Sequence, residues 1–299
     1  MTRSFVRSPL IAGLFVLVLA AGATGCGRKQ PDTPAVATPT VTLTHDRVPA
    51  GSVVDVTYKW VVAGDAHFDQ DYRVFVHVKD LDGDQLWGDD HFPPVPTSQW
   101  KPGQTVEYTR TLFAPVFPYV GEATIEVGMH STNPNPREQV RLTLNGQNTG
   151  QHAYKVATLS LLPQTDNLFT VFKDGWHRTE SPEQDALVEW QWTKKDATLA
   201  FKNPKRDAIL YLDTDAPGSP YDAQQIQVTL GGQTIDTFEQ KPMERELRKV
   251  KLPAAQMGSG DMAEAHLIVD KTFVPQQVSG SGDTRVLGIR VFHVFVDAR

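Results

Sequence analysis

The sequence is poor in cysteine, with Cys26 as the single example among 299 residues. No disulfide can form within the chain, and a zinc site built from several cysteines is excluded. Basic residues are also in deficit, because 29 Lys and Arg stand against 35 Asp and Glu, a formal net charge of −6. Nonspecific nucleic-acid binding needs clustered Lys and Arg to neutralise phosphates, so this balance argues against a nucleic-acid partner.

Long apolar runs are missing as well. The strongest one, Leu10 to Ala21, is shorter than the roughly 20 residues that a membrane-spanning helix needs. Arg3 and Arg7 precede it, and the small residues 23–25 (ATG) follow it. A basic start, a short apolar stretch and a small-residue end are typical of a secretory signal peptide.

Small residues followed by Cys26 resemble the lipobox of bacterial lipoproteins. The resemblance implies a diacylglyceryl thioether on Cys26, cleavage before it and acylation of its new amino group. Because Gly27 rather than aspartate comes next, it also favours the outer membrane, facing the periplasm or the cell surface, over the inner membrane. We therefore predict a signal peptide over residues 1–25, membrane attachment through the lipid and no other cofactor. There are two alternatives. The protein could be an ordinary secreted protein with a free cysteine, or the segment could be an N-terminal membrane anchor.

A helical period is absent beyond this leader, and period-two alternation dominates instead. Residues 53–62, for example, alternate between an apolar and a more polar face, which is typical of antiparallel strands. Similar alternation predicts a strand at 140–144, and Gly231-Gly232 predicts a two-residue hairpin. The run 286–296 (VLGIRVFHVFV) is apolar on both alternations and predicts a central strand buried on both faces.

Proline-rich and polar segments divide the chain. Residues 26–40 contain three prolines among small and polar residues, which predicts a flexible tether after the lipidated cysteine. The length suits about two domains of roughly 150 residues each, and PQTDN (163–167) separates two series of strands. We predict an all-β protein of two tandem antiparallel β-sandwich domains, Ig-like or jelly-roll-like, over 41–163 and 167–299.

Two blocks of the sequence resemble known bacterial modules. Residues 72–113, with a VFVH strand, an Asp-Gly hairpin and a T-x-x-W strap, are similar to a β-sandwich module appended to membrane glycosyltransferases of the mannosyltransferase type. Residues 172–204 and 283–296, with a Gly-Trp, a W-x-W strand and a D-x-R-x-L-G strand, resemble a β-sandwich of polysaccharide-assembly proteins and bacterial lipoproteins. Because the chain carries no transferase domain, the resemblance implies a role in polysaccharide or envelope assembly rather than in glycosyl transfer.

Recognisable catalytic motifs are lacking. The sequence contains no Walker A loop, no G-x-S-x-G elbow and no H-E-x-x-H motif. Glycoside hydrolysis needs two acids on either side of the scissile bond, and no feature selects such a pair. We therefore predict a protein that is not an enzyme, with a glycoside-hydrolase-like enzyme using an unrecognised carboxylate pair as a further alternative.

Histidines and aspartates cluster on either side of one predicted hairpin. The cluster comprises His67, Asp69, Asp71, Asp89, Asp90 and His91. If the two loops meet, these side chains can hold a divalent ion, because carboxylates and imidazoles are common metal ligands. A pair of solvated acidic loops without a metal is the favoured alternative.

The tryptophans of the second domain offer the best candidate for a binding site. Trp176 has His177 and Glu180 nearby, and sugars stack on exposed rings while polar neighbours bond their hydroxyls. A core or structural role for Trp176 is the alternative. Trp190 and Trp192 are two residues apart and share a strand face, which is a stacking platform if it points outward and core if it points inward.

These features predict a lipid-anchored, non-catalytic cell-envelope protein. Its ligand would be a glycan or a partner in polysaccharide or envelope assembly, bound around Trp176. The alternative is a structural scaffold lipoprotein that binds only an envelope protein through its sheet edges.

Overall fold

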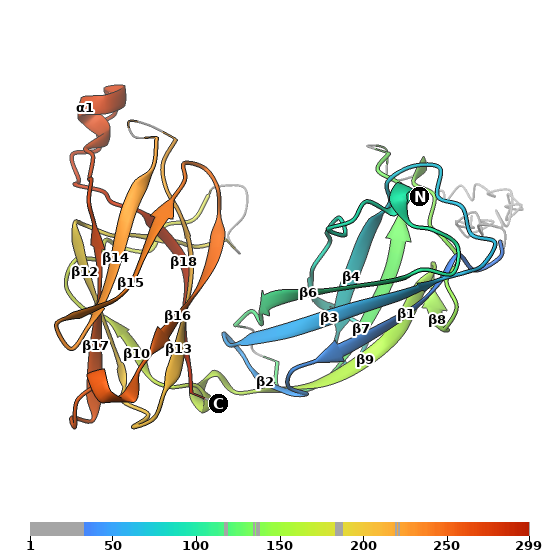
Figure 1. The fold of residues 1–299 in the computed structure, drawn as a ribbon, viewed down its shortest axis with the longest axis horizontal. Coiled ribbons are helices and arrows are strands. Elements are labelled where there is room, and N and C mark those ends of the chain that lie inside the picture. The colour runs from blue at the N-terminus through green and yellow to red at the C-terminus, as the bar shows by residue number, and fades with distance from the viewer. Residues whose placement is uncertain are drawn as a thin grey trace, which may run out of the picture. The chain divides into compact units, whose positions relative to one another are not determined.

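The computed structural model describes residues 33–116, 119–133, 135, 138–182, 188–218, 220 and 222–298. The predicted signal peptide, Cys26 and the start of the predicted tether lie outside these residues. Within them the protein is all-β, as predicted, and two sets of sheets follow one another along the chain (Figure 1). No helix in this part of the chain is long and apolar enough to cross a membrane.

The first set contains nine strands among the described residues. They are β1 (Ala37–Leu43), β2 (Arg47–Pro49), β3 (Val53–Val62), β4 (Arg73–Lys79), β5 (Gln85–Gly88), β6 (Thr105–Phe113), β7 (Gly121–His130), β8 (Gln147–Gly150) and β9 (Ala153–Leu162). One sheet has the order β1-β3-β6, and the other has the order β2-β9-β7-β4-β5 with β8 on β9. The β2–β9 pair is parallel, and the other pairs of this set are antiparallel.

Alternate side chains of these strands fill the first core. Tyr58 and Trp60 of β3 are fully buried, because residues two apart on a strand turn toward the same opposing sheet. Trp100 of the T-x-x-W strap packs against Phe68 with ring centroids 5.6 Å apart, and its Nε1 donates to the Val95 carbonyl at 2.9 Å. The strap tryptophan is thus a core residue.

The second set contains nine more strands of the described chain. They are β10 (Thr170–Phe172), β11 (Gln191–Trp192), β12 (Asp196–Lys202), β13 (Ala208–Asp215), β14 (Gln224–Leu230), β15 (Gln233–Gln240), β16 (Glu246–Leu252), β17 (Met262–Val269) and β18 (Arg290–Asp297). They form two antiparallel sheets, with the orders β10-β12-β17-β14-β15 and β11-β18-β13-β16. Gly231 and Gly232 both have positive φ and make the predicted hairpin between β14 and β15.

Helical elements are few and short in the part of the chain that the structure describes. They are α1 (Pro275–Ser279) and the 3₁₀ turns η1 (Thr97–Gln99), η3 (Gln164–Asp166) and η4 (Ala254–Gln256). η3 lies within the predicted boundary, residues 163–167. Among the described strands, no strand before η3 pairs with a strand after it. The sequence did not predict α1, because five residues are too few to show a helical period.

Three predictions about the strands are corrected by the structure. β1 begins at Ala37, inside the predicted tether, because Ala37 pairs with Val62 and its side chain is buried. The predicted strand at 140–144 is reduced to one bridge between His130 and Arg141. The chain leaves β7 there, and the Thr143 carbonyl accepts the N–H of Val36 instead.

The third correction concerns β18. It is central in its sheet, as predicted, but it is not buried on both faces. Ile289 and Val291 lie in the core, whereas Phe292 is partly exposed and 46% of the His293 side chain is exposed. Apolar composition on both alternations indicated burial, but the outer face of this sheet carries aromatic rings that meet solvent.

Candidate functional site

A short segment before β11 widens the four-stranded sheet of the second sandwich. Trp176 and Glu180 form antiparallel bridges with Thr193 and Trp190. The segment therefore lies beside β11 in the same sheet. Two adjacent stretches of chain thus carry the five residues that the sequence proposed as ligand-binding: Trp176, His177, Glu180, Trp190 and Trp192.

Gly175 positions this segment. Its φ is +87°, and a Cβ at this position would lie 1.9 Å from the carbonyl oxygen of Asp196. The Gly175 carbonyl also accepts the backbone N–H of Lys194 at 2.7 Å. Only glycine allows this left-handed turn and this close backbone approach, so the residue before Trp176 is fixed by the fold.

Strand register places the two tryptophans of the W-x-W motif on the outer face of the sheet. Trp192 pairs with Arg290 in β18. The neighbours of Arg290, Ile289 and Val291, are buried in the core, so Arg290 and Trp192 point the other way. Trp190 lies two residues before Trp192 and shares its face.

Trp176 points inward instead. It bridges Thr193, which is fully buried, and packs against the core of the second sandwich. Its Nε1 donates to the Thr198 carbonyl at 2.8 Å, and Phe172 contacts it edge-on with centroids 4.6 Å apart. The predicted binding role of Trp176 does not fit this position, because its ring connects the two sheets, as the alternative of a structural role predicts. The outward platform is formed by Trp190 and Trp192.

Rings and guanidinium groups alternate across this outer surface. We define the aromatic–arginine face as Trp190, Trp192, Arg245, Arg290 and Phe292. Arg290 Cζ lies 5.2 Å from the ring centroid of Trp190, 5.7 Å from that of Trp192 and 5.4 Å from that of Phe292. Arg245 Cζ lies 3.9 Å from the Phe292 centroid. Cation–π attraction in these contacts holds the side chains together.

Two aspartates of β13 hold the arginines in place through ion pairs. Arg290 donates through Nε and Nη2 to Asp215 at 2.7 and 2.5 Å. Arg245 donates in the same way to Asp213 at 2.9 and 2.5 Å, and His293 Nδ1 lies 2.9 Å from Asp213. Such bidentate pairs set the plane of each guanidinium group.

The charge of Asp213 is secured by these contacts. Burial alone raises the pKa of Asp213, but the hydrogen bonds from Arg245 and His293 outweigh burial and bring the pKa below its usual value. Asp213 is therefore ionised at neutral pH.

The exposed parts of the Trp190 indole are carbon. Its Nε1 is buried and has no hydrogen-bond partner among the described residues. Trp190, Trp192 and Phe292 are each partly exposed. The aromatic–arginine face thus offers C–H and ring surface beside oriented N–H donors, a combination that suits a ligand with both apolar faces and hydroxyl groups.

The sequence did not single out Arg245, Arg290, Phe292 or the two aspartates. A signal for them exists, because Asp213 and Asp215 are two apart in β13, and Arg290 and Phe292 are two apart in β18. Paired positions of this kind mark one strand face. The contact between them depends on the register of β13 with β18, which joins residues far apart in the sequence.

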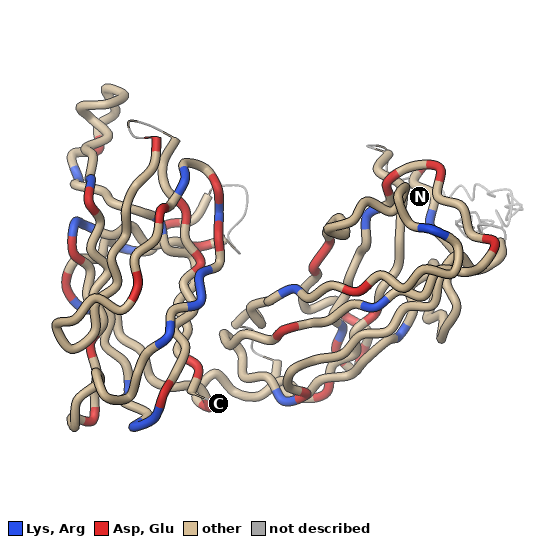
Figure 2. The backbone as a smooth tube through the Cα atoms, in the orientation of Figure 1, with Lys and Arg blue, Asp and Glu red and all other residues tan. Residues whose placement is uncertain are grey.

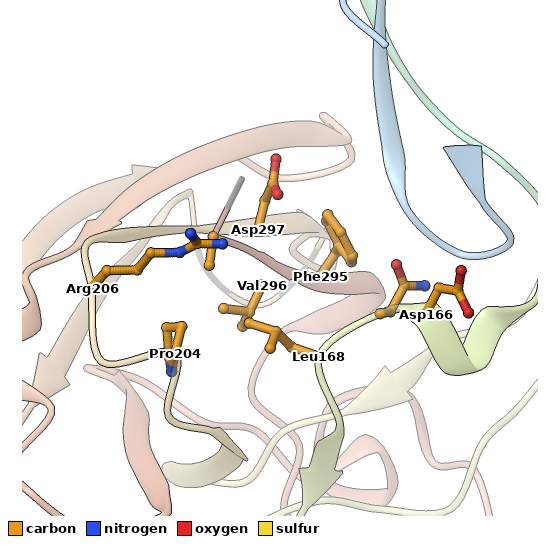
Figure 3. Close-up of a pocket in the computed structure, with 9 residues that line it drawn as sticks. Asp166, Leu168, Pro204, Arg206, Phe295, Val296 and Asp297 are labelled. Carbon is orange, nitrogen blue, oxygen red and sulfur yellow. The ribbon is translucent and has the colours of Figure 1, made fainter. Parts of the chain in front are cut away.

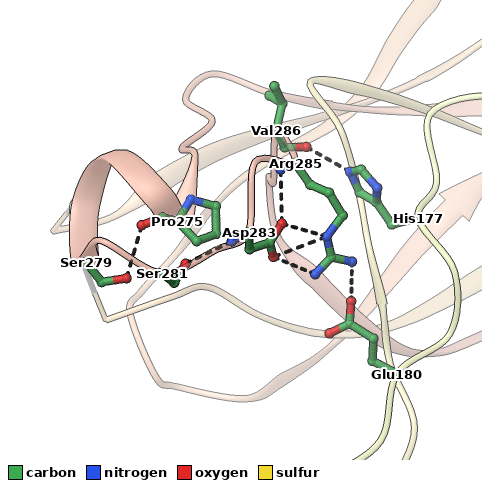
Figure 4. A network of polar contacts seen from close by, with 8 residues as sticks. All are labelled: His177, Glu180, Pro275, Ser279, Ser281, Asp283, Arg285 and Val286. Atoms are coloured by element: carbon green, nitrogen blue, oxygen red, sulfur yellow. Dashed lines mark hydrogen bonds and ion pairs between the residues drawn. The ribbon is translucent and has the colours of Figure 1, made fainter.

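The other two predicted residues anchor the chain that enters β18. Arg285 donates to both carboxylate oxygens of Asp283, at 2.9 Å from Nε and 2.7 Å from Nη2, and also to Glu180 (Figure 4). His177 Nε2 lies 2.8 Å from the carbonyl oxygen of Val286. His177 and Glu180 therefore tie the Trp176 segment to the strand that carries Arg290.

This anchor predicts an acid-sensitive contribution to stability. The hydrogen bonds from Arg285 lower the pKa of Asp283 from 3.8 to about 2. Because the folded-state pKa lies below the unfolded value, the stabilisation is present above about pH 4 and is lost as the pH falls toward about 2. The replacement Asp283→Asn should therefore lower Tm at neutral pH, and its difference from wild type should become much smaller as the pH falls toward about 2 in thermal unfolding.

The exposed pair Lys241–Glu244, with its atoms 3.8 Å apart, supplies a matched control. We expect Lys241→Gln to leave Tm unchanged across the same pH range, since exposed pairs contribute little. An Asp283→Asn deficit that stays constant down to pH 2 would contradict the assignment to this ion pair.

Two of the first three proposed metal ligands, Asp69 and Asp71, accept hydrogen bonds from residues of the neighbouring loops. Asp69 accepts the Tyr72 hydroxyl at 2.8 Å, and Asp71 accepts the Ser98 hydroxyl at 2.6 Å. His67 is exposed. Each aspartate thus serves its own loop rather than a shared centre.

Of the second three, Asp89 and His91 lie together, with 3.3 Å between Oδ2 and Nδ1, whereas Asp90 points away from them. Asp89 is mostly buried and binds Arg110 through both carboxylate oxygens at 2.7 Å, while Tyr58 donates to it at 3.1 Å. His91 is buried beside it, whereas Asp90 is exposed. Across the described residues no group of three or more His, Cys, Asp or Glu is placed to hold a metal ion. The structure therefore does not bring the six residues together.

Other surface features do not gather the predicted residues. A cavity of about 300 Å³ is lined by Leu168, Pro204, Arg206 and the end of β18, but by none of the predicted site residues (Figure 3). Basic and acidic residues are interspersed along the strands of both sandwiches (Figure 2). The aromatic–arginine face is thus the candidate site that combines predicted residues with a defined geometry.

Comparisons with known proteins find solved structures only at low identity and low TM-scores. No protein-family model matches the chain, and no curated protein matches it. SGBP-B from a complex xyloglucan utilization locus in Bacteroides uniformis is 10% identical with a TM-score of 0.33, and the match covers 88% of this chain and 73% of that one. SGBP-B of the Bacteroides ovatus mixed-linkage glucan utilization locus is 13% identical with a TM-score of 0.26, covering 89% and 53%.

The secreted serine protease VesC from Vibrio cholerae is similar at the same level. It is 10% identical with a TM-score of 0.24, and the match covers 87% of this chain and 51% of VesC. A glycan-locus protein and a protease thus stand side by side at TM-scores below 0.5, so these similarities do not distinguish binding from catalysis. The resemblance to glycosyltransferase-linked and polysaccharide-assembly modules stays a prediction.

Proposed function

We propose that the protein is a lipid-anchored, non-catalytic binding protein of the cell envelope, and that it holds a glycan on the aromatic–arginine face. The strongest support is the arrangement of three partly exposed rings around guanidinium groups that bidentate aspartates hold in place. Sugars stack their C–H faces on aromatic rings, and their hydroxyl oxygens accept hydrogen bonds from guanidinium N–H groups. Both the aromatic rings and the guanidinium donors are held in place before a ligand binds.

The chemistry of the carboxyl groups favours binding over hydrolysis. A glycoside hydrolase needs one carboxylic acid with a raised pKa near a second carboxylate. On the aromatic–arginine face, Asp213 has a lowered pKa and is hydrogen-bonded to Arg245 and His293. A carboxylate held in this way is a poor proton donor, so we propose no catalytic step.

The lipid anchor is part of the same proposal and rests on the sequence of residues 1–26. Acylation of Cys26 would hold the sandwiches at a membrane, with the outer membrane favoured, where glycans and envelope proteins are within reach. The replacement Cys26→Ser should abolish labelling by an alkyne-tagged fatty acid in growing cells and release the protein from the membrane fraction. Labelling that persists in Cys26→Ser would contradict the anchor without affecting the glycan site.

Glycan binding itself is tested by removing one ring. On a glycan array, with the full chain in detergent, we expect Trp190→Ala to weaken binding about tenfold, which corresponds to about 1.4 kcal/mol. The matched control is Phe169→Ala, because Phe169 is an exposed aromatic (64%) of the same sandwich outside the aromatic–arginine face. Equal binding by wild type and both variants would place the site elsewhere. No binding to any glycan would favour the protein-only scaffold.

A further inference from the structure

The way in which charges are paired on the aromatic–arginine face indicates which glycans it accepts, an inference that rests on the function proposed above. Arg290 is opposed by Asp215, and Arg245 by Asp213, in each case through two hydrogen bonds. Arg285 at the edge of the same surface is opposed by Asp283 and Glu180. Each of these guanidinium groups is therefore neutralised before a ligand arrives.

Neutralised arginines still donate hydrogen bonds. A guanidinium group carries five N–H donors, and the bonds to Asp213 and Asp215 use only Nε and Nη2. Nη1 of Arg245 and Nη1 of Arg290 make no hydrogen bond within the described part of the chain. Sugar hydroxyls can accept hydrogen bonds from these Nη1 groups. A carboxylate or sulfate at the same place would be repelled by the nearby charges of Asp213 and Asp215, and it would find no arginine whose charge is still unpaired.

The ring geometry adds a second restriction. The centroids of Trp190 and Phe292 are 6.0 Å apart, and their planes are inclined by 56°. Two rings at this inclination cannot both stack on one flat array of sugar chains. A single chain that turns between neighbouring sugars can meet both.

We infer that the aromatic–arginine face binds a single, soluble, uncharged glycan chain and discriminates against uronic-acid or sulfated glycans and against crystalline polysaccharide. Recognition then comes from ring stacking and from hydrogen bonds donated by paired arginines. Electrostatic attraction plays no part, so the affinity should be nearly independent of ionic strength.

The test measures the affinity of the full chain in detergent for three classes of probe. These are soluble neutral polysaccharides (xyloglucan, mixed-linkage glucan and dextran), polyuronates (alginate and polygalacturonate) and microcrystalline cellulose. We expect at least one neutral soluble probe to bind at least about tenfold more tightly than any polyuronate or cellulose. Its Kd should change less than about twofold between about 0.05 and 0.5 M NaCl.

A charge variant sharpens the test. Asp215→Asn leaves a hydrogen-bond partner for Arg290 but removes the neutralising charge, so it should bind polyuronate more tightly than wild type, in a salt-dependent manner. Asp213→Asn provides the same readout beside Arg245 if Asp215→Asn does not fold. No gain of polyuronate affinity in a folded variant would overturn the inference.

The outcomes separate this inference from the proposed function. Polyuronate or cellulose binding that equals neutral binding and is lost in Trp190→Ala would overturn the ligand class while leaving glycan binding intact. Absence of binding to every probe and every arrayed glycan would overturn both.

Discussion

Replacement of Arg290 by methionine is expected to lower the free energy of unfolding of the second sandwich by about 3–5 kcal/mol. The reason is the Asp215 carboxylate, whose side chain is only 7% exposed and whose hydrogen bonds come from Arg290. Methionine keeps an unbranched apolar stem but cannot reach or neutralise the carboxylate, so a buried charge is left unpaired. Denaturant unfolding measures the loss, and hydrogen exchange locates it in β11, β13 and β18.

Lys173→Met is the matched control for Arg290→Met. Lys173 pairs with Glu264 at 2.6 Å, but both side chains are 45% exposed. Exposed pairs contribute only about 0–1 kcal/mol, so this variant should be nearly as stable as wild type. If the two variants lost the same amount of unfolding free energy, the claim that Asp215 is buried away from solvent would be contradicted.

Replacement of Arg110 by methionine should destabilise the first sandwich by a similar amount, about 3 kcal/mol or more. Arg110 neutralises Asp89, whose side chain is 9% exposed and which also accepts a hydrogen bond from Tyr58. In wild type, burial raises the pKa of Asp89, but hydrogen bonds from His91 and Arg110 outweigh it and hold the pKa below 3.8.

The pH dependence of this variant has a defined sign. Wild-type stabilisation by Asp89 is present above the unfolded pKa of about 3.8 and is lost as the pH falls through the folded value. Removing Arg110 takes away contacts that lower the folded pKa of Asp89 while burial, which raises it, stays, so protonation of Asp89 costs the variant less than it costs wild type. The deficit of Arg110→Met should therefore be largest at neutral pH and shrink below about pH 4 in denaturant unfolding. A deficit that grows on acidification would contradict the role of Asp89.

Much of the fold could be predicted because alternation reports directly which strand face is buried. Residues 53–62 alternate in the sequence and form β3 over the same span, with Tyr58 and Trp60 in the core. Apolar content alone misled where two faces are both apolar, as in β18, because it does not say whether a ring meets solvent. Residues 140–144 show the alternation of a strand in the sequence, but they pair with β7 through only one bridge, between His130 and Arg141.

The candidate site was predictable only in part, for a physical reason. That Trp190 and Trp192 share a face follows from their spacing, but which face depends on the pairing of Trp192 with Arg290 almost a hundred residues later. Tryptophan suits either location, since its large ring favours burial and its N–H favours a polar boundary. The aspartates beneath the arginines depend on long-range register as well, so local patterns did not reveal them.

Footprinting of the aromatic–arginine face with hydroxyl radicals, with and without a saturating neutral glycan, tests the central claim most directly. Aromatic side chains react when they are exposed, and a bound sugar shields them. We expect Trp190, Trp192 and Phe292 to lose reactivity in the presence of the glycan, while Phe169 keeps its own. Protection confined to the first sandwich, or unchanged reactivity of Trp190 in a protein that demonstrably binds the glycan, would contradict the claim that this face is the binding site.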